Sequence, residues 1–242
     1  MYMSNIYNDE KFFKEYAKMS RSQYGLEGAG EWHQFKSFFE DLTNNNVLDL
    51  GCGYGWHSKY CIDQGAKHVY AIDLSAKMIE KAKQINSHSQ ISYHVMNICD
   101  YAYPEQQYDL VISNLVLHYI ENLTDIYEKV FCTLKVNGTF IFNIEHPTFT
   151  AGINEDFIYD EKGAIKYYPI DNYYFSGKRE TLFLGQPVEK YHHTLTQIMN
   201  DLFVCGFKIE RIEEAMPEKD APWYESEMKR PMMLLVKAKK IG

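Results

Sequence analysis

The chain has 242 residues, of which 45% are hydrophobic, 24% charged and 15% aromatic. This composition is typical of a globular protein with a large core, and it excludes a disordered chain or a disulfide-stapled mini-protein. The formal net charge is -8, from 33 acidic and 25 basic residues with no run of like charges. Such a chain lacks the basic surface that nucleic-acid binding requires, so we expect no nucleic acid among its partners.

Five cysteines are scattered along the chain without a Cys-x-x-Cys pair, which argues against a zinc site or a disulfide framework, and we expect no metal. The longest uncharged apolar stretch runs from Leu110 to Ile120 and is too short to span a bilayer. The first residues reach the charged Asp9 before any apolar run develops. We therefore expect a cytoplasmic protein without membrane contact.

The predicted elements begin with a helical, aromatic-rich cap over residues 1–44, in which Trp32, Phe35 and Phe39 share one face. From Val47 onward, short apolar strands alternate with amphipathic helices. The strands are predicted near 46–50, 68–72, 91–96, 108–113 and 138–144, and the helices near 55–64, 75–86 and 123–134. This alternation predicts an α/β fold with a parallel sheet and right-handed crossovers.

Residues 145–190 interrupt the alternation and contain nine Phe or Tyr residues. Because a disordered linker is poor in aromatic residues, we predict an ordered insertion. We expect it to act as a lid over the carboxyl edge of the sheet, where open α/β folds bind ligands. After it, apolar residues at helical spacing predict a last helix from Leu195 that ends at Gly206, followed by strands near 207–213 and 232–239.

The segment that indicates a function is VLDLGCGYG, residues 47–55, in which a short apolar strand runs into a glycine-dense turn and then a helix. Glycines suit a turn with unusual dihedral angles and allow a ligand to approach bare backbone. Nicotinamide and flavin enzymes also use a glycine-rich turn at this place, so the turn alone leaves the ligand open.

Three details narrow the choice of ligand. Trp56 stands where the dinucleotide-binding pattern requires a third small residue, so a pyrophosphate would fit badly. Asp49 lies just ahead of the turn, where a carboxylate suits a cationic ligand or backbone amides better than a phosphate. Asp73 ends the next strand, from which a carboxylate can accept hydrogen bonds from both hydroxyls of a ribose. These details favour a nucleoside with a cationic group.

Four segments in order resemble the class I S-adenosylmethionine-dependent methyltransferases: VLDLGCGYG, HVYAID with its terminal acid, YDLVISNLVLHYI, and the strand TFIFNI. The resemblance spans about residues 47–145. It implies a single Rossmann-like domain over residues 1–242, with a seven-stranded, mostly parallel sheet whose last strand is reversed and with helices on both faces. It also implies that the cofactor is S-adenosylmethionine and that the activity is methyl transfer to a small molecule.

The resemblance also assigns roles to single residues. Three glycines would cradle the methionine moiety, Asp49 would orient the turn and the amino group, and Asp73, followed by Leu74, would bind the ribose. The remaining positions are Asn97 and Ile98 for adenine, and Ser113 and Asn114 for the methionine end. The cradle glycines are Gly51, Gly53 and Gly55.

The outer segments are similar to a subset of small-molecule methyltransferases whose substrates are unassigned. The shared features are Tyr16, Arg21-Ser22 and Glu31-Trp32 near the start, Glu145-His146-Pro147 after the fifth strand, and Tyr191-His192-His193-Thr194 before the last helix. In that subset an arginine stands where this chain has His193, so the substrate could differ. Tyr16 and Arg21 could close over the cofactor.

His146 and His192 flank the insertion and are the candidate catalytic bases, because a histidine of near-neutral pKa can take a proton from a hydroxyl or an amine. His118 is a weaker candidate for substrate contact. We expect a direct in-line displacement, for which a dedicated base is optional. The alternatives are a non-catalytic module that binds S-adenosylmethionine or S-adenosylhomocysteine, and a nicotinamide oxidoreductase. The acceptor molecule, its reacting atom and the oligomeric state stay open.

Overall fold

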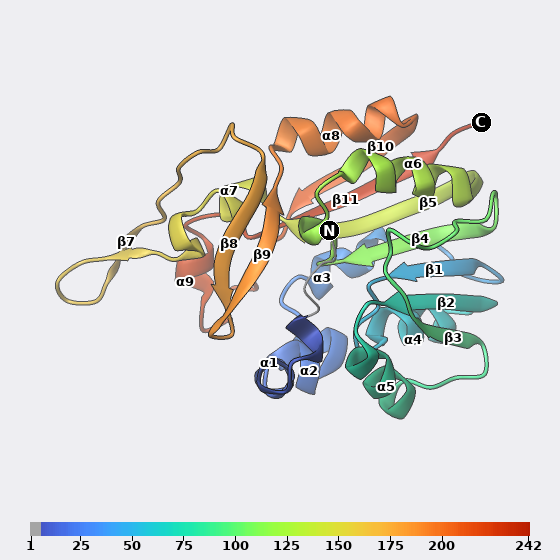
Figure 1. Cartoon of the computed structure of the whole chain (residues 1–242), viewed down its shortest axis with the longest axis horizontal. Helices are drawn as coiled ribbons and strands as arrows, with labels where there is room; N and C mark the ends of the chain where they lie inside the picture. Colours follow the sequence, from blue (N-terminus) through green and yellow to red (C-terminus); the bar gives the residue numbers. More distant parts are fainter. Residues whose placement is uncertain (1–5) are drawn as a thin grey trace.

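A computed structural model describes residues 6–242 and contains a seven-stranded sheet at its centre (Figure 1). The strand order is β10-β11-β5-β4-β1-β2-β3, and β11 alone runs opposite to the other six strands. This confirms the predicted sheet with its reversed last strand. The strands are β1 Asn46–Leu50, β2 His68–Asp73, β3 Ile91–Val95, β4 Tyr108–Asn114, β5 Leu134–Glu145, β10 Phe207–Glu214 and β11 Met233–Lys240.

The helices that connect the strands start at local capping groups. Ser75, Asn122 and Thr194 each accept a hydrogen bond from a backbone N–H of the first turn of α5, α6 and α8. Gly55 stands ahead of α4 in a left-handed conformation. All four helices lie within two residues of their predicted limits: α4 Trp56–Asp63, α5 Ala76–Ile85, α6 Leu123–Thr133 and α8 Leu195–Val204.

Both faces of the sheet are buried, because alternate residues of each strand enter two different cores. In β1, Leu48 packs in the core that includes Val130 of α6 and Leu202 of α8. Its neighbour Val47 packs in the other core, with Cys61 of α4. Side chains of parallel strands alternate between two helix layers in this way, so the ligand site lies at the strand ends rather than on a face.

The N-terminal segment forms short helices, as its pattern predicts. They are η1 Ile6–Asn8, α1 Glu10–Tyr16, α2 Ser20–Gln23, η2 Gly25–Gly28, α3 Trp32–Phe35 and η3 Lys36–Phe38. The side chains of Phe12, Phe35 and Phe38 are buried. Ser75 Oγ donates a hydrogen bond of 2.7 Å to Asn8 Oδ1, which fastens the segment to the start of α5.

The segment after β5 forms short helices and two separate hairpins. Figure 1 shows β8 and β9 standing across the end of the large sheet, with β6 and β7 projecting beyond them. The elements here are α7 Pro147–Thr150, η5 Ile153–Glu155, β6 Ile158–Tyr159, β7 Ile165–Tyr167, β8 Gly177–Phe183 and β9 Gln186–His192. Two short helices remain, η4 Leu117–Tyr119 after β4 and α9 Tyr224–Glu227 before β11. Among residues 6–242, no helix is both long and apolar enough to cross a membrane.

Candidate functional site

A cavity of about 520 Å³ opens at the carboxyl ends of β1, β2, β4 and β5. One wall comes from the strand ends and carries Gly51, Gly53 and Asp73. The opposite wall comes from η4, from Glu145 at the end of β5 and from the segment that follows it, including the β8–β9 hairpin. The N-terminal helices close a third side. We call these the first wall, the second wall and the N-terminal wall.

The glycine turn of the first wall is held by backbone hydrogen bonds. The amides of Gly51 and Cys52 donate to the carbonyl oxygen of Ile72, at 2.8 and 2.9 Å. Gly51 has a φ of +76°, and a Cβ there would lie 2.2 Å from Val116 Cγ2. Gly53 has a φ of +52°, and a Cβ there would meet nothing within 4 Å. The turn therefore presents bare backbone to the cavity at Gly53 and packs closely at Gly51.

Gly55 lies behind this turn. The residues that line the cavity do not include it, and its φ of +77° starts α4. A Cβ at this position would lie 2.2 Å from the hydroxyl oxygen of Tyr93. In this structure Gly55 shapes the turn and does not face the cavity.

Asp73 is fixed at the end of β2 by two backbone amides. Its Oδ1 accepts from the amide of Ser75 at 2.8 Å, and its Oδ2 accepts from the amide of Gly53 at 2.9 Å. Burial raises the pKa of this carboxyl to about 6, although both amides favour the ionised form. A carboxylate with free lone pairs on the wall of a cavity can accept hydrogen bonds from two neighbouring hydroxyls.

Asp49 lies beneath the turn, and only 1% of its surface is exposed. Its Oδ2 accepts a hydrogen bond of 2.6 Å from Ser58 Oγ, whereas its Oδ1 has no partner among the described residues. Burial raises the pKa of Asp49 to about 7, and the charge of Asp73 adds to that rise. Asp49 does not line the cavity, so it would act through the turn.

The other predicted cofactor residues divide between the cavity and the core. Leu74, Asn97, Ile98 and Asn114 line the cavity. Asn97 Oδ1 already accepts from the amide of Cys99, at 2.9 Å. Ser113 is fully buried and is not among the lining residues, because its hydroxyl faces the carbonyl oxygen of Leu50 at 3.4 Å.

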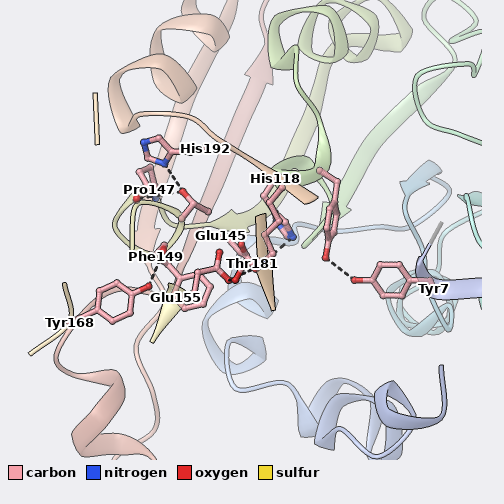
Figure 2. A network of polar contacts seen from close by, with 12 residues as sticks. Tyr7, His118, Glu145, Pro147, Phe149, Glu155, Tyr168, Thr181 and His192 are labelled. Carbon is pink, nitrogen blue, oxygen red and sulfur yellow. Dashed lines mark hydrogen bonds and ion pairs between the residues drawn. The ribbon is translucent and has the colours of Figure 1, made fainter. Parts of the chain in front are cut away.

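The N-terminal wall brings Tyr16 and Arg21 to the same cavity. Arg21 donates two hydrogen bonds to the buried Glu31 carboxylate, at 3.1 and 3.0 Å. Tyr7 also lines this wall, and its hydroxyl lies 2.9 Å from that of Tyr119 (Figure 2). The pair joins the N-terminal segment to η4 across the cavity.

The two histidines predicted as bases lie outside the cavity. His146 is the N-cap of α7, where its Nδ1 accepts from the amide of Thr148 and its Nε2 lies 3.1 Å from Glu214. His192 is fully buried, with Nδ1 2.7 Å from Thr150 Oγ1 and Nε2 2.8 Å from the carbonyl oxygen of Tyr173. Because both rings are engaged in holding the segment after β5, neither is placed to take a proton from a molecule in the cavity. The geometry of the cavity therefore does not favour the catalytic role that the sequence predicts for them.

Four polar residues of the second wall lie close together: Glu145, Glu155, Lys190 and His118. Figure 2 labels Glu145, Glu155 and His118. Lys190 Nζ lies 2.7 Å from Glu145 Oε1 and 2.9 Å from Glu155 Oε2. His118 Nε2 lies 3.7 Å from the same Glu145 oxygen. We call these four residues the acidic cluster. Glu145 Oε2 and His118 Nδ1 have no hydrogen-bond partner within residues 6–242.

Burial controls the protonation of the acidic cluster. It raises the pKa of both Glu145 and Glu155, and the nearby ammonium of Lys190 opposes that rise. Burial would lower the pKa of Lys190, but the two carboxylates outweigh it and the pKa is raised. Burial holds the pKa of His118 well below its usual range, so its ring is neutral.

Sequence reasoning did not identify this cluster. Glu145 and His118 belong to separate motifs of the sequence. Glu155 lies 10 residues beyond Glu145 in the chain, and Lys190 lies 45 residues beyond it. No short spacing predicts that they meet. A charged residue in a strand is also expected to face solvent, whereas the side chain of Lys190 is 2% exposed. Among the described residues, no three His, Cys, Asp or Glu side chains are grouped closely enough to hold a metal ion.

Comparison with known proteins identifies relatives of this arrangement. The family model described as a methyltransferase domain matches residues 48–142. A structure from Listeria monocytogenes, assigned to the S-adenosylmethionine-dependent methyltransferases, is 42% identical, with a TM-score of 0.83, over 88% of this chain and 99% of that one. An S-adenosylmethionine-dependent methyltransferase from Mesorhizobium loti is 34% identical, with a TM-score of 0.82, over 89% of this chain and 100% of that one.

The name of a more distant relative states which molecule that relative methylates. The malonyl-[acyl-carrier protein] O-methyltransferase of Acetivibrio thermocellus is 33% identical over 107 residues, which are 43% of this chain and 38% of that protein. The chain thus matches less than half of this relative.

Proposed function

The chain belongs to the family of S-adenosylmethionine-dependent methyltransferases, and from this premise we propose that it methylates a small molecule bound against the second wall of the cavity. The observation that carries the proposal is the continuity of the cavity, in which the glycine turn and Asp73 share one space with the acidic cluster. A site that only held the cofactor would not need that second wall.

S-adenosylmethionine, when bound, supplies a methyl group on a sulfonium that is already activated for departure. We propose that Asp73 accepts hydrogen bonds from the ribose hydroxyls and that the bare backbone at Gly53 lies against the methionine moiety. Arg21 and Tyr16 would close the methionine end, and Asn97 with Ile98 would border the adenine. The positive φ values of the turn and the two amides that fix Asp73 support these roles.

Methyl transfer would be a direct in-line displacement, for which the protein supplies orientation and exclusion of water. The N-terminal wall contributes the Tyr7–Tyr119 hydrogen bond across the cavity. We propose that residues 145–190 act as a lid on the opposite side, since β8 and β9 stand across the end of the sheet (Figure 1) and residues of this segment line the cavity. Together the two segments would separate the reacting atoms from solvent.

The proposal is tested by thermal unfolding of the purified protein with S-adenosylmethionine, S-adenosylhomocysteine or NAD. A ligand present at 100 times its dissociation constant adds about 2.7 kcal/mol to the free energy of unfolding. We expect stabilisation by the first two ligands only, and its loss in Asp73→Ala. Asp63→Ala, an exposed helix position paired with Lys59, is the matched control and should respond like the wild type. Stabilisation by NAD alone would contradict the proposal.

A further inference from the structure

We propose that the methyl acceptor is a small amine with an apolar substituent, and that its nitrogen binds Glu145 and His118 in the second wall. This inference rests on the proposed function, because it concerns the acceptor of that same reaction. It depends on three properties of the second wall: its charge, its unpaired acceptor atoms and its apolar neighbours.

Carboxylates outnumber cations around the cavity. Among the described lining residues, the carboxylates are Asp73, Glu145, Glu155 and Glu189, and the cations are Arg21 and Lys190. Glu189 is neutralised by Lys178 at 2.6 Å, which leaves the first three carboxylates to set the charge of the cavity. Neither cation is available to an anionic ligand, because Arg21 is held by the buried Glu31 and Lys190 by two carboxylates. An acceptor that carries a carboxylate or a phosphate would therefore face net negative charge.

Within the acidic cluster, one ammonium is shared by two carboxylates, so ionisation of both leaves one negative charge without a counter-ion. A charge removed from water is stable only when it is paired and hydrogen-bonded. The ammonium group of a protonated amine would supply the missing charge.

Two acceptor atoms in the second wall lack a donor, as far as the described residues show: Glu145 Oε2 and His118 Nδ1. Only 3% of the His118 surface is exposed, and its ring is neutral. If its Nε2–H faces the carboxylate of Glu145, then Nδ1 is a bare acceptor. Both atoms are buried just behind the cavity surface. Buried polar atoms in native proteins almost always have partners, so two unpaired acceptors beside one cavity indicate a ligand with several donors, which would reach them by a turn of the Glu145 and His118 side chains. An amine nitrogen has such donors, whereas an alcohol has one.

Apolar side chains adjoin the acidic cluster in the same wall. Leu182, Phe183 and Val188 come from the β8–β9 hairpin, and Phe149 from α7. The stem of the acceptor would lie against these residues, and aromatic rings near an ammonium add further attraction. The wall therefore suits an amine that carries an aliphatic or aromatic body rather than a bare amine.

The reaction balances without a further reagent. The ammonium first loses a proton to the carboxylate of Glu145, which frees the lone pair of the nitrogen. That pair then forms the nitrogen–carbon bond to the methyl group as the carbon–sulfur bond breaks, and the bonding pair stays on sulfur as a neutral thioether. Burial makes Glu145 a better proton acceptor than an exposed carboxylate, because it raises the pKa of the group.

The experiment measures dissociation constants by calorimetry at pH 7.5 on protein saturated with S-adenosylhomocysteine. The probes are benzylamine, phenethylamine and tryptamine, each compared with the alcohol and the carboxylate of the same skeleton. We expect at least one amine to bind at least tenfold more tightly than both of its counterparts. We expect Glu145→Gln to remove that preference and leave the affinity for S-adenosylhomocysteine unchanged. Lys190 keeps Glu155 in this variant, so the wall should stay folded.

Glu180→Gln is the matched control, since it makes the same chemical change in β8, at a side chain that is 78% exposed and outside the cavity. It should bind the probes like the wild type. If no amine binds more tightly than its alcohol and carboxylate, the wild-type data alone overturn the inference, even if Glu145→Gln does not fold. An amine preference that survives in Glu145→Gln also overturns it.

One further result would show that the negative charge of Glu145 serves the methyl donor rather than the acceptor. If Glu145→Gln weakens S-adenosylmethionine but not S-adenosylhomocysteine, the carboxylate compensates the sulfonium and the amine inference is wrong. Failure of the wild type to bind S-adenosylhomocysteine would instead contradict the proposed function itself. The two failures are thus distinguishable.

Discussion

Gly51 and Gly53 lie two residues apart in one turn, and both have a positive φ, but a side chain would meet different surroundings at each. At Gly51 it would collide with Val116, whereas at Gly53, which lines the cavity, it would meet no atom within 4 Å. Stability and ligand binding should therefore respond separately to substitution at the two positions.

We expect Gly51→Ala to lower the free energy of unfolding by about 2–4 kcal/mol, since left-handed strain adds to overpacking. Gly53→Ala should cost only about 1–2 kcal/mol, the strain alone, and should weaken S-adenosylhomocysteine at least tenfold. Urea unfolding and calorimetry measure the two effects. Equal losses of stability in both variants would show that the turn does not separate packing from binding.

At the scale of elements, few hydrogen bonds join the N-terminal wall to the rest of the chain near the cavity. Its described polar links to the rest of the chain near the cavity include the Tyr7–Tyr119 bond and the bonds of Ser75 to Asn8 and to the carbonyl oxygen of Tyr7. Two longer bonds, both of 3.4 Å, join Lys77 to Asn8 and Asn143 to Glu31. A segment with few such contacts opens more readily than the sheet.

A bound cofactor should therefore slow cleavage of the N-terminal segment. Lys14 and Lys18 lie on its exposed surface and are sites for trypsin. We expect S-adenosylhomocysteine to reduce cleavage there severalfold, because the ligand would add contacts to Tyr16 and Arg21. Cleavage at Lys162, in the projecting β6–β7 hairpin, serves as the control and should not change. Equal protection at all three sites would indicate global stabilisation instead.

The elements also show how far the sequence alone could lead. The helix from Leu195 was predictable because its apolar spacing, its cap at Thr194 and its end at Gly206 agree. The β8–β9 hairpin was not predicted. Its turn consists of Leu184 and Gly185, both with positive φ, and leucine is not a usual signal for such a turn.

In the candidate site, too, some residues were predictable from the sequence and others were not. Local motifs predicted the glycine turn and Asp73, because neighbouring residues form them. The acidic cluster depends on three segments that meet only in the folded chain, and one of its members is a buried lysine. His146 and His192 were chosen as bases for their place beside the insertion, and the fold uses their rings as caps and cross-links.

For the whole molecule, the buried carboxylates predict a pH dependence of stability. The pKa of Asp49 is about 7 in the folded state, well above that of an exposed aspartate. The folded state therefore binds this proton more tightly than the unfolded state. The contribution of the group to stability is complete below about pH 4 and is lost as the pH rises toward 7.

We expect Asp49→Asn to remove this loss. Between pH 5 and pH 8, without cofactor, the wild type should lose roughly 2 kcal/mol relative to the variant. The asparagine oxygen can still accept from Ser58, so the local hydrogen bond is kept. Urea unfolding of both proteins at the two pH values gives the difference. Parallel stability curves would mean that Asp49 does not titrate in this range.

The two main walls of the cavity come from different stretches of the chain. The first wall lies within residues 48–142, the part that the methyltransferase family model matches, whereas most of the second wall follows residue 144. Substitutions in the hairpin can accordingly alter which molecule is methylated while the machinery that presents the methyl group is inherited unchanged. Relatives that share the first stretch need share no substrate. A chimera designed to transfer specificity between them should exchange residues 145–191 together with residue 118.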